Sequence, residues 1–229
     1  MLPYKDENKL NSFPIVTILL IILNVVIFTY SLVIGFEDTV LNYGFIPRDF
    51  TLFDLASYKN IITSMFLHGS WLHLIGNMMF LYIFGDNVED KLGKVFFIIV
   101  YLLGGIFAAL AQYLTNTSSI IPMIGASGAI SALLSSYIIF FPHVQIKMIY
   151  FSTNGQFGTS DMTSKYFLLY WFAFQIFSTI GSFSSDIQGG TAYMAHVGGF
   201  LFGLCTALLI NKFELFGMHK NRLHEFDTK

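Results

Sequence analysis

The sequence has 229 residues, of which 55% are hydrophobic and 11% charged, and its mean hydropathy is +0.65. A soluble domain carries about 25% charged residues, so this composition argues against an ordinary soluble protein and predicts a polytopic membrane protein in a lipid bilayer. The formal net charge is −2, and without a basic tract we expect no nucleic-acid partner. The single cysteine excludes an intrachain disulfide.

Six apolar segments, taken in chain order, predict transmembrane helices. A span needs about 20 apolar residues; the fourth and fifth segments are shorter, which is tolerated where neighbouring helices cover their ends. We therefore predict an all-α bundle of six spans within residues 14–211, with terminal tails at 1–13 and 212–229. The spans cover residues 14–34, 61–85, 95–114, 127–141, 166–181 and 192–211.

The basic residues predict how these spans are oriented. Ten lie in one set of loops and tails, and two lie in the other set. Because Lys and Arg are enriched in cytoplasmic loops, we expect both termini in the cytoplasm and the starts of the second, fourth and sixth spans at the outer face. The ten are Lys5, Lys9, Lys91, Lys94, Lys147, Lys165, Lys212, Lys220, Arg222 and Lys229; the two are Arg48 and Lys59.

A serine opens the fourth span in the motif Gly125-Ala126-Ser127-Gly128. A serine in a membrane helix often only packs helices together or bonds a carbonyl one turn back. Here the flanking glycines permit a tight turn, and the start of a helix offers unpaired amide groups. An oxyanion formed at Ser127 would meet these donors, as acyl transfer requires.

A histidine lies inside the sixth span, in Ala195-His196-Val197-Gly198-Gly199. Ionisable residues in a membrane are costly, so His196 is a functional-site hypothesis, with Ser127 as nucleophile and His196 as its base. Gly199 and Gly203 form a G-x-x-x-G pair, which predicts close approach to another helix, with the glycines of the fourth span as counterparts. The spans contain no interior carboxylate, which favours a Ser–His dyad over an aspartyl protease or a proton pump.

His73 and Asn77 lie four residues apart and share one helical face. They are either structural polar contacts or, beside Ser127 and His196, donors to an oxyanion. On a single helix His68 would point about 140° away from His73, and the sequence has no H-E-x-x-H motif. We therefore expect no metal and no cofactor, and assign His68 no catalytic role.

Taken together, these motifs resemble the rhomboid family of intramembrane serine proteases, from about residue 60 to 211. The resemblance implies a six-helix bundle around a water-filled cavity that opens to the outer face. It implies Ser127 as nucleophile, His196 as general base, and His73, Asn77 and the Ser127 backbone amide as the oxyanion hole. It also implies single-pass transmembrane proteins as substrates. The motifs are Phe66-Leu67-His68-Gly69 with His73 and Asn77, Glu89-Asp90-Lys91-Leu92-Gly93, Gly125-Ala126-Ser127-Gly128 and Ala195-His196-Val197-Gly198-Gly199.

Some positions carry further implications of this resemblance. Glu89 resembles a position that ties loop and helix ends together. Position 131, four residues after the serine, often carries an aromatic that stacks on the histidine, but is Ser131 here. The loop 36–60 lacks the Trp-Arg pair of some relatives, yet is amphipathic enough to lie in the outer interface. The fifth span and the following Gly189-Gly190 are expected to form the substrate gate.

The leading functional hypothesis is an intramembrane serine endopeptidase of the cell membrane, working through an acyl-enzyme with its active site toward the outer face. The alternative is a proteolytically inactive rhomboid-like protein that binds transmembrane clients; such proteins generally lack the serine or the histidine, and this chain has both. A channel or transporter is disfavoured because no intramembrane charge marks a path. The sequence gives no indication of the oligomeric state.

Overall fold

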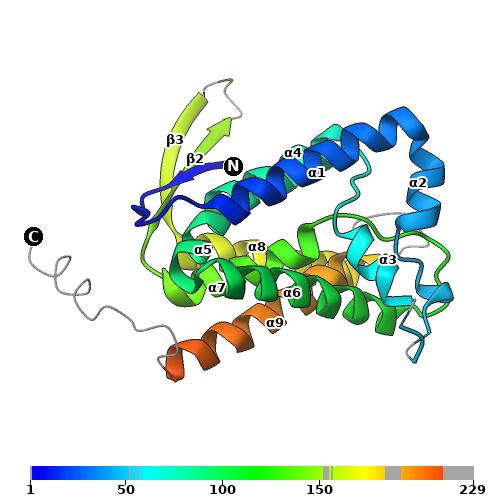
Figure 1. The fold of residues 1–229 in the computed structure, drawn as a ribbon. Coiled ribbons are helices and arrows are strands. Elements are labelled where there is room, and N and C mark those ends of the chain that lie inside the picture. Colours follow the sequence, from blue (N-terminus) through cyan, green and yellow to red (C-terminus); the bar gives the residue numbers. More distant parts are fainter. Residues whose placement is uncertain are drawn as a thin grey trace, which may run out of the picture.

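Long helices lying side by side make up most of the molecule in the computed structural model, which describes residues 2–51, 53–55, 57–151, 155, 157–183 and 192–213 (Figure 1). The long helices are α1 (Ile15–Ile34), α6 (Lys94–Thr115), α7 (Ser127–Phe140), α8 (Ser164–Phe183) and α9 (Tyr193–Lys212). Among the described residues, α1, α6 and α9 are long and apolar enough to cross a membrane, and α7 is a shorter apolar helix.

Glycines bring α6, α7 and α9 into close contact at the centre of the bundle. A Cβ atom on Gly199 would overlap the carbonyl oxygen of Gly128, and one on Gly203 would overlap that of Ala132. A Cβ atom on Gly104 of α6 would likewise overlap the methyl group of Ala132. The predicted close approach through the G-x-x-x-G pair is confirmed, with the fourth apolar segment as its partner.

The predicted helix over residues 61–85 is broken in the structure. A short helix, α3 (Ser57–Ser64), is followed by a turn, and α4 (Trp71–Phe80) begins only afterwards. The Ser70 side chain caps α4 by accepting a hydrogen bond from the backbone N–H of His73 at 3.1 Å. The prediction of one helix through this segment is therefore wrong before Trp71. From there the helix continues through η2 (Leu81–Gly85), a π-helical turn, into α5 (Asp86–Leu92).

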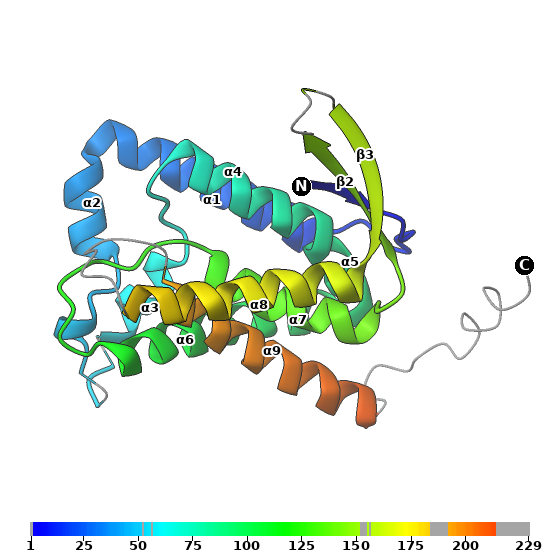
Figure 2. The ribbon, with the colours of Figure 1, turned by 180° about the vertical axis from the view of Figure 1, so that it is seen from behind.

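A three-stranded antiparallel sheet lies at the end of the bundle that holds the N-terminus (Figures 1 and 2). Its order is β1 (Leu2–Asp6), β2 (Gln145–Phe151), β3 (Phe157–Thr163). Lys5 pairs with Lys147 across the first two strands, and Ile146 and Met148 point into the core. The all-α prediction missed this sheet, and residues 2–6 are an ordered strand rather than part of a separate tail.

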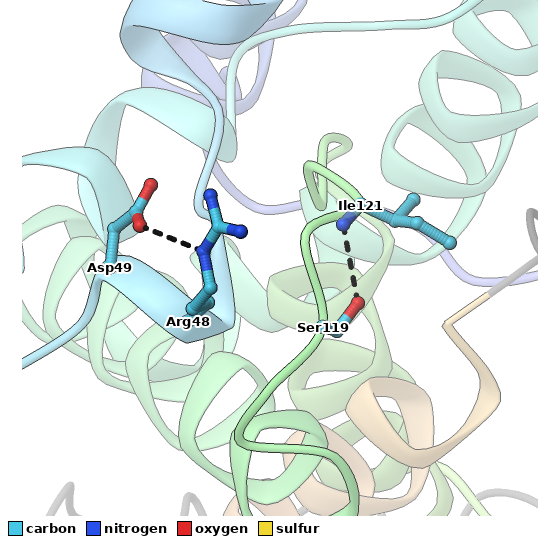
Figure 3. A network of polar contacts seen from close by, with 4 residues as sticks. All are labelled: Arg48, Asp49, Ser119 and Ile121. Carbon is cyan, nitrogen blue, oxygen red and sulfur yellow. Dashed lines mark hydrogen bonds and ion pairs between the residues drawn. The ribbon is translucent and has the colours of Figure 1, made fainter.

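At the opposite end, the loop after α1 lies against the segment that leads to Ser127. This loop contains α2 (Phe36–Tyr43) and η1 (Pro47–Asp49). Phe45 and Met123 exchange backbone hydrogen bonds of 3.1 and 2.8 Å, and the Arg48 N–H donates to the Ser119 carbonyl at 3.0 Å. Figure 3 shows Arg48 beside this segment, where the Ser119 hydroxyl also accepts from the Ile121 N–H at 3.3 Å. The chain segment that leads to Ser127 is therefore held in place by hydrogen bonds to the loop after α1.

Two neighbouring carboxylates of α5 hold the start of α1. Glu89 accepts hydrogen bonds from the N–H groups of Val16 and Thr17 at 3.0 and 2.7 Å, and from the Thr17 hydroxyl. Asp90 accepts four hydrogen bonds from the backbone and side chains of Asn11 and Ser12. Partial burial raises the pKa of Asp90, but these hydrogen bonds outweigh it and lower the pKa overall. The role that the resemblance implies for Glu89, tying chain segments together, is confirmed.

A second carboxylate pair lies where the end of β1 meets the start of α5, and consists of Asp6 and Asp86. Asp6 Oδ2 accepts from the Tyr137 hydroxyl at 2.5 Å and from Asn87 Nδ2 at 2.8 Å. Asn87 Nδ2 also donates to Asp86 Oδ1 at 2.7 Å, so one amide lies between the two acids. Burial, and secondarily the nearby charge of Asp6, raise the pKa of Asp86 to about 7, and burial likewise raises the pKa of Asp6.

This pair predicts a stability that falls as the pH rises toward neutrality. Between the ordinary pKa of an aspartate and about 7, the folded protein holds a proton on Asp86 that the unfolded chain has released. Folding then takes up a proton, and the free energy of unfolding decreases with pH by at most about 1.4 kcal/mol per pH unit. Asp86→Asn should reduce the pH dependence of the melting temperature, measured in detergent between pH 5 and 7.5. Glu37→Gln, at an exposed acid of α2, should leave the slope as in the wild type, and an unchanged slope in Asp86→Asn would contradict this assignment.

Candidate active site

A cavity of about 370 Å³ lies between α4, α7, α8 and α9. Its walls are largely apolar, with contributions from Leu72, Phe80 and Phe174. The polar side chains that face it come from each of the four helices. They are His73, Asn77, Ser127, Gln175, Tyr193 and His196. All four side chains that the sequence predicts for the site therefore line one cavity.

Ser127 and His196 are hydrogen-bonded across the contact between α7 and α9. The Ser127 Oγ atom lies 2.7 Å from His196 Nε2. Ser127 is the first residue of α7, and His196 lies in the first turn of α9, where its side chain is 7% exposed. The glycine contact between Gly128 and Gly199 lies one residue after Ser127 and three after His196. This contact brings the two helix starts close enough for a direct hydrogen bond.

The turn before Ser127 requires glycine at position 125. Gly125 has φ +125°, which side chains disfavour, and its N–H donates to the Ser64 carbonyl at 2.9 Å. Ala126, at the N-cap of α7, provides no side-chain capping hydrogen bond. The first amide groups of α7, including that of Ser127, are therefore left for a ligand at the helix start.

His73 and Asn77 present N–H donors at the same place. His73 Nδ1 accepts from the Gly69 N–H at 3.3 Å, so the proton of the neutral ring lies on Nε2. A Cβ atom on Gly125 would lie 2.8 Å from that Nε2 atom and 3.7 Å from Asn77 Nδ2. The Asn77 amide nitrogen is buried and has no acceptor within the part of the chain that the structure describes. Both donors thus lie beside the turn that leads to Ser127.

His68 lies outside the helix on which we expected it. It occupies the turn before α4, is buried, and packs edge-on against His73 with ring centroids 5.1 Å apart. The expected 140° separation on one helix is wrong because the helix begins at Trp71. His68 supports the ring of His73 and does not line the cavity.

Gln175 belongs to the site although its sequence context did not predict it. Its Oε1 atom, on α8, lies 2.7 Å from His196 Nδ1. The Trp171 ring lies 5.9 Å from the imidazole at an angle of 36°, while Ser131 turns away and donates to the Ser127 carbonyl at 2.7 Å. The available signal was a single amide inside the apolar segment 166–181. The expected gate residues Gly189-Gly190 lie outside the described residues.

Comparison with known proteins shows the family of this chain. The profile of the rhomboid domain matches residues 56–213, which is more than half of the chain. The chain belongs to the rhomboid family. Members of this family are generally intramembrane serine proteases, and the apolar helices fit a rhomboid membrane protein.

Three rhomboid relatives illustrate how far the similarity extends. YdcA of Bacillus subtilis (strain 168), named as a provisional rhomboid protease, is 29% identical over 209 residues, covering 90% of each chain. Rhomboid protein 1, mitochondrial, of Saccharomyces cerevisiae is 28% identical over 74% of this chain and 46% of its own. Rhomboid-like protein 11, chloroplastic, of Arabidopsis thaliana is 27% identical over 73% of this chain and 58% of its own. The chain thus spans most of the first relative and about half of the other two.

The packing at Gly125 makes a prediction for this rhomboid domain. In Gly125→Ala the new methyl group would lie 2.8 Å from the ring of His73 and the residue would be strained at positive φ, so the ring must shift. We expect a loss of about 1–3 kcal/mol in stability, together with slower labelling of Ser127 by a fluorophosphonate probe. Gly93→Ala is the matched control because Gly93 also has positive φ, but nothing lies within 4 Å of the new methyl group. Equal labelling rates in the two variants would contradict the predicted displacement of His73.

Proposed function

We propose that this protein is an intramembrane serine endopeptidase that cleaves transmembrane segments through a Ser127–His196 dyad. One observation carries the proposal: Ser127 Oγ lies 2.7 Å from His196 Nε2 at the wall of a cavity between apolar helices. A hydroxyl is a weak nucleophile until a base is within hydrogen-bond reach, and this geometry meets that requirement. Membership of the rhomboid family supports the same activity.

We further propose that residues 14–211 contain six spans in the cell membrane, and that strand β1 at the N-terminus and the C-terminal residues 212–229 lie on the cytoplasmic side. The distribution of basic residues in the fold supports this orientation. Lys5 and Lys147 pair in the sheet, at the end of the bundle opposite α2 (Figure 1). Ser127, His196 and the start of α4 lie toward the α2 end, which the positive-inside rule assigns to the outer face.

In the proposed reaction the Ser127 Oγ atom attacks the scissile carbonyl carbon, and His196 Nε2 takes the hydroxyl proton. The resulting imidazolium gives that proton to the leaving amine, which departs as the C–N bond breaks and leaves an ester on Ser127. A water molecule, deprotonated by the same nitrogen, then attacks the ester. The carboxylic product leaves and the proton returns to Ser127 Oγ.

The oxyanion of each tetrahedral intermediate needs donors already in place. We assign this role to His73 Nε2–H, the Asn77 amide and the Ser127 backbone N–H. Their support is the tautomer that the Gly69 N–H imposes on His73, the buried and unpaired Asn77 nitrogen among the described residues and the uncapped start of α7. Donors held rigidly in a site of low dielectric constant are worth more than the same donors in water.

The substrates that fit the site are single-pass transmembrane proteins. The cavity wall has apolar side chains from α4 and α8, including Leu72 and Phe174, so an apolar segment can enter once its helix unwinds. Ser127, His73 and His196 lie in the first turns of their helices, and Asn77 lies one turn further along α4. We infer that cleavage occurs near the outer end of the substrate's span, where water can reach the acyl-enzyme.

Loss of the nucleophile tests the proposal directly. The protein should be reconstituted in liposomes with a fluorescently labelled transmembrane substrate, and cleavage followed by gel and mass spectrometry. Ser127→Ala should lose cleavage and fluorophosphonate labelling completely. Ser136→Ala, on the same helix with its hydroxyl bonded to the Ala132 carbonyl, should retain both. Unchanged cleavage in Ser127→Ala would rule out the assignment, whereas a wild type that binds the substrate and leaves it intact would favour the inactive, client-binding function.

Removing the Asn77 amide tests the oxyanion assignment. Asn77→Ala should lower kcat by about 10²-fold with little change in KM, because its donor acts on a charge that exists only in the transition state. Asn24→Ala is the matched control: it deletes a fully buried amide of α1 that does not line the cavity, and should change the melting temperature but not kcat. Equal kcat in Asn77→Ala and the wild type would remove Asn77 from the oxyanion hole.

A further inference from the structure

We propose that Gln175 is a positioning residue that fixes the tautomer and the ring orientation of His196. The inference rests on the proposed function and adds to it a third group, contributed by a third helix. Both ring nitrogens of His196 are engaged at 2.7 Å, Nε2 by Ser127 Oγ and Nδ1 by Gln175 Oε1. A buried histidine bonded at both nitrogens has one ring position and one preferred tautomer.

The chemistry of the amide decides which tautomer that is. A glutamine carbonyl oxygen has no proton to donate and only accepts, so His196 Nδ1 must carry the ring proton. Nε2 is then unprotonated, with its lone pair available to the Ser127 hydroxyl. The opposite tautomer would direct an N–H at Ser127 and leave the serine without a base. Gln175 therefore selects the only neutral form of His196 that can activate Ser127.

Among the described residues around His196, Gln175 is the one that accepts a hydrogen bond from Nδ1. Trp171 and Tyr193 lie 5.9 and 6.5 Å from the imidazole, centroid to centroid, and limit the tilt of its plane. The Ser131 hydroxyl is bonded to the Ser127 carbonyl, and within the described residues the carboxylates do not line this cavity. Aromatic contacts restrict the ring plane, but a 180° rotation about the Cβ–Cγ bond, which would put Cδ2 and Cε1 in the places of Nδ1 and Nε2, is opposed by the two hydrogen bonds.

Gln175 also makes the dyad depend on where α8 lies. Gln175 and Trp171 are four residues apart and share the face of α8 that meets α9, where Phe172 stacks on Phe200 with centroids 3.9 Å apart. Displacing this face from α9 would remove the acceptor from Nδ1 together with one wall of the cavity. His196 is thus oriented for catalysis only while α8 is docked.

Substitutions that remove or keep the acceptor test the inference. Gln175→Leu has a similar volume without the acceptor and should lower kcat about tenfold to hundredfold, the range expected for a lost hydrogen bond to a group that becomes charged. KM should change little. Gln175→Glu keeps an acceptor at the same distance and should recover most of kcat. Tyr170→Leu, on the exposed face of α8, controls for general perturbation of the helix and should match the wild type.

A spectroscopic measurement separates this inference from the proposed function. In wild-type protein labelled with ¹⁵N-histidine, with His196 assigned by its absence in His196→Gln, the shifts should show a protonated Nδ1 and a bare Nε2. Gln175→Leu should show a mixture of tautomers. A wild type with the proton on Nε2, or a Gln175→Leu variant with wild-type kcat and tautomer, would overturn the role of Gln175. An inactive wild type would instead overturn the proposed function, and the tautomer would still be measured even if Gln175→Leu failed to fold.

Discussion

The contact between α7 and α9 is the constraint on which the rest of the site depends. Gly199 lies so close to the Gly128 carbonyl that a methyl group would overlap it, and Gly203 has the same relation to Ala132. In a bilayer the hydrophobic effect does not draw helices together. Close packing of small residues therefore has to hold them in contact. Because Ser127 and His196 flank these glycines, the contact that joins the helices also sets the distance between hydroxyl and imidazole. Stability and the proposed chemistry share the same few residues.

At the opposite end of the molecule, two carboxylates of α5 hold the start of the first helix, α1. Only part of α1 is buried against its neighbours, and its first amide groups lack intrahelical acceptors. Glu89 accepts two of these N–H groups, and Asp90 holds the residues just before the helix. The strand β1 then pairs with β2, and β3 leads directly into α8. The N-terminal strand is thereby connected through one small sheet to the helix that carries Gln175.

The parts of this site that the sequence predicts are those with a local signal. Ser127 stands between glycines, and His196 interrupts an apolar run, so each is conspicuous within a few residues. Gln175 carries no such context, because a lone amide in a span is commonly a packing contact, and its pairing with His196 joins different helices. The strand pairing of Lys5 with Lys147 is equally non-local. The start of α4 at Trp71 was missed for another reason: apolar residues continue on both sides of it within 61–85, and the break is marked only by the short polar stretch that ends in Gly69 and the N-cap Ser70.

A neutral amide suits the position that Gln175 occupies better than the carboxylate of a soluble triad. An ionised carboxylate inside the membrane is costly unless paired, whereas glutamine accepts the same hydrogen bond from Nδ1–H without a charge. The resting chain of Ser127, His196 and Gln175 is then uncharged, and charge separation arises only when Nε2 takes the serine proton. An amide stabilises the resulting imidazolium less than a carboxylate would. In the proposed mechanism more of the stabilisation must therefore fall on the oxyanion, which accounts for two side-chain donors, His73 and Asn77, beside a helix start that lacks a side-chain cap.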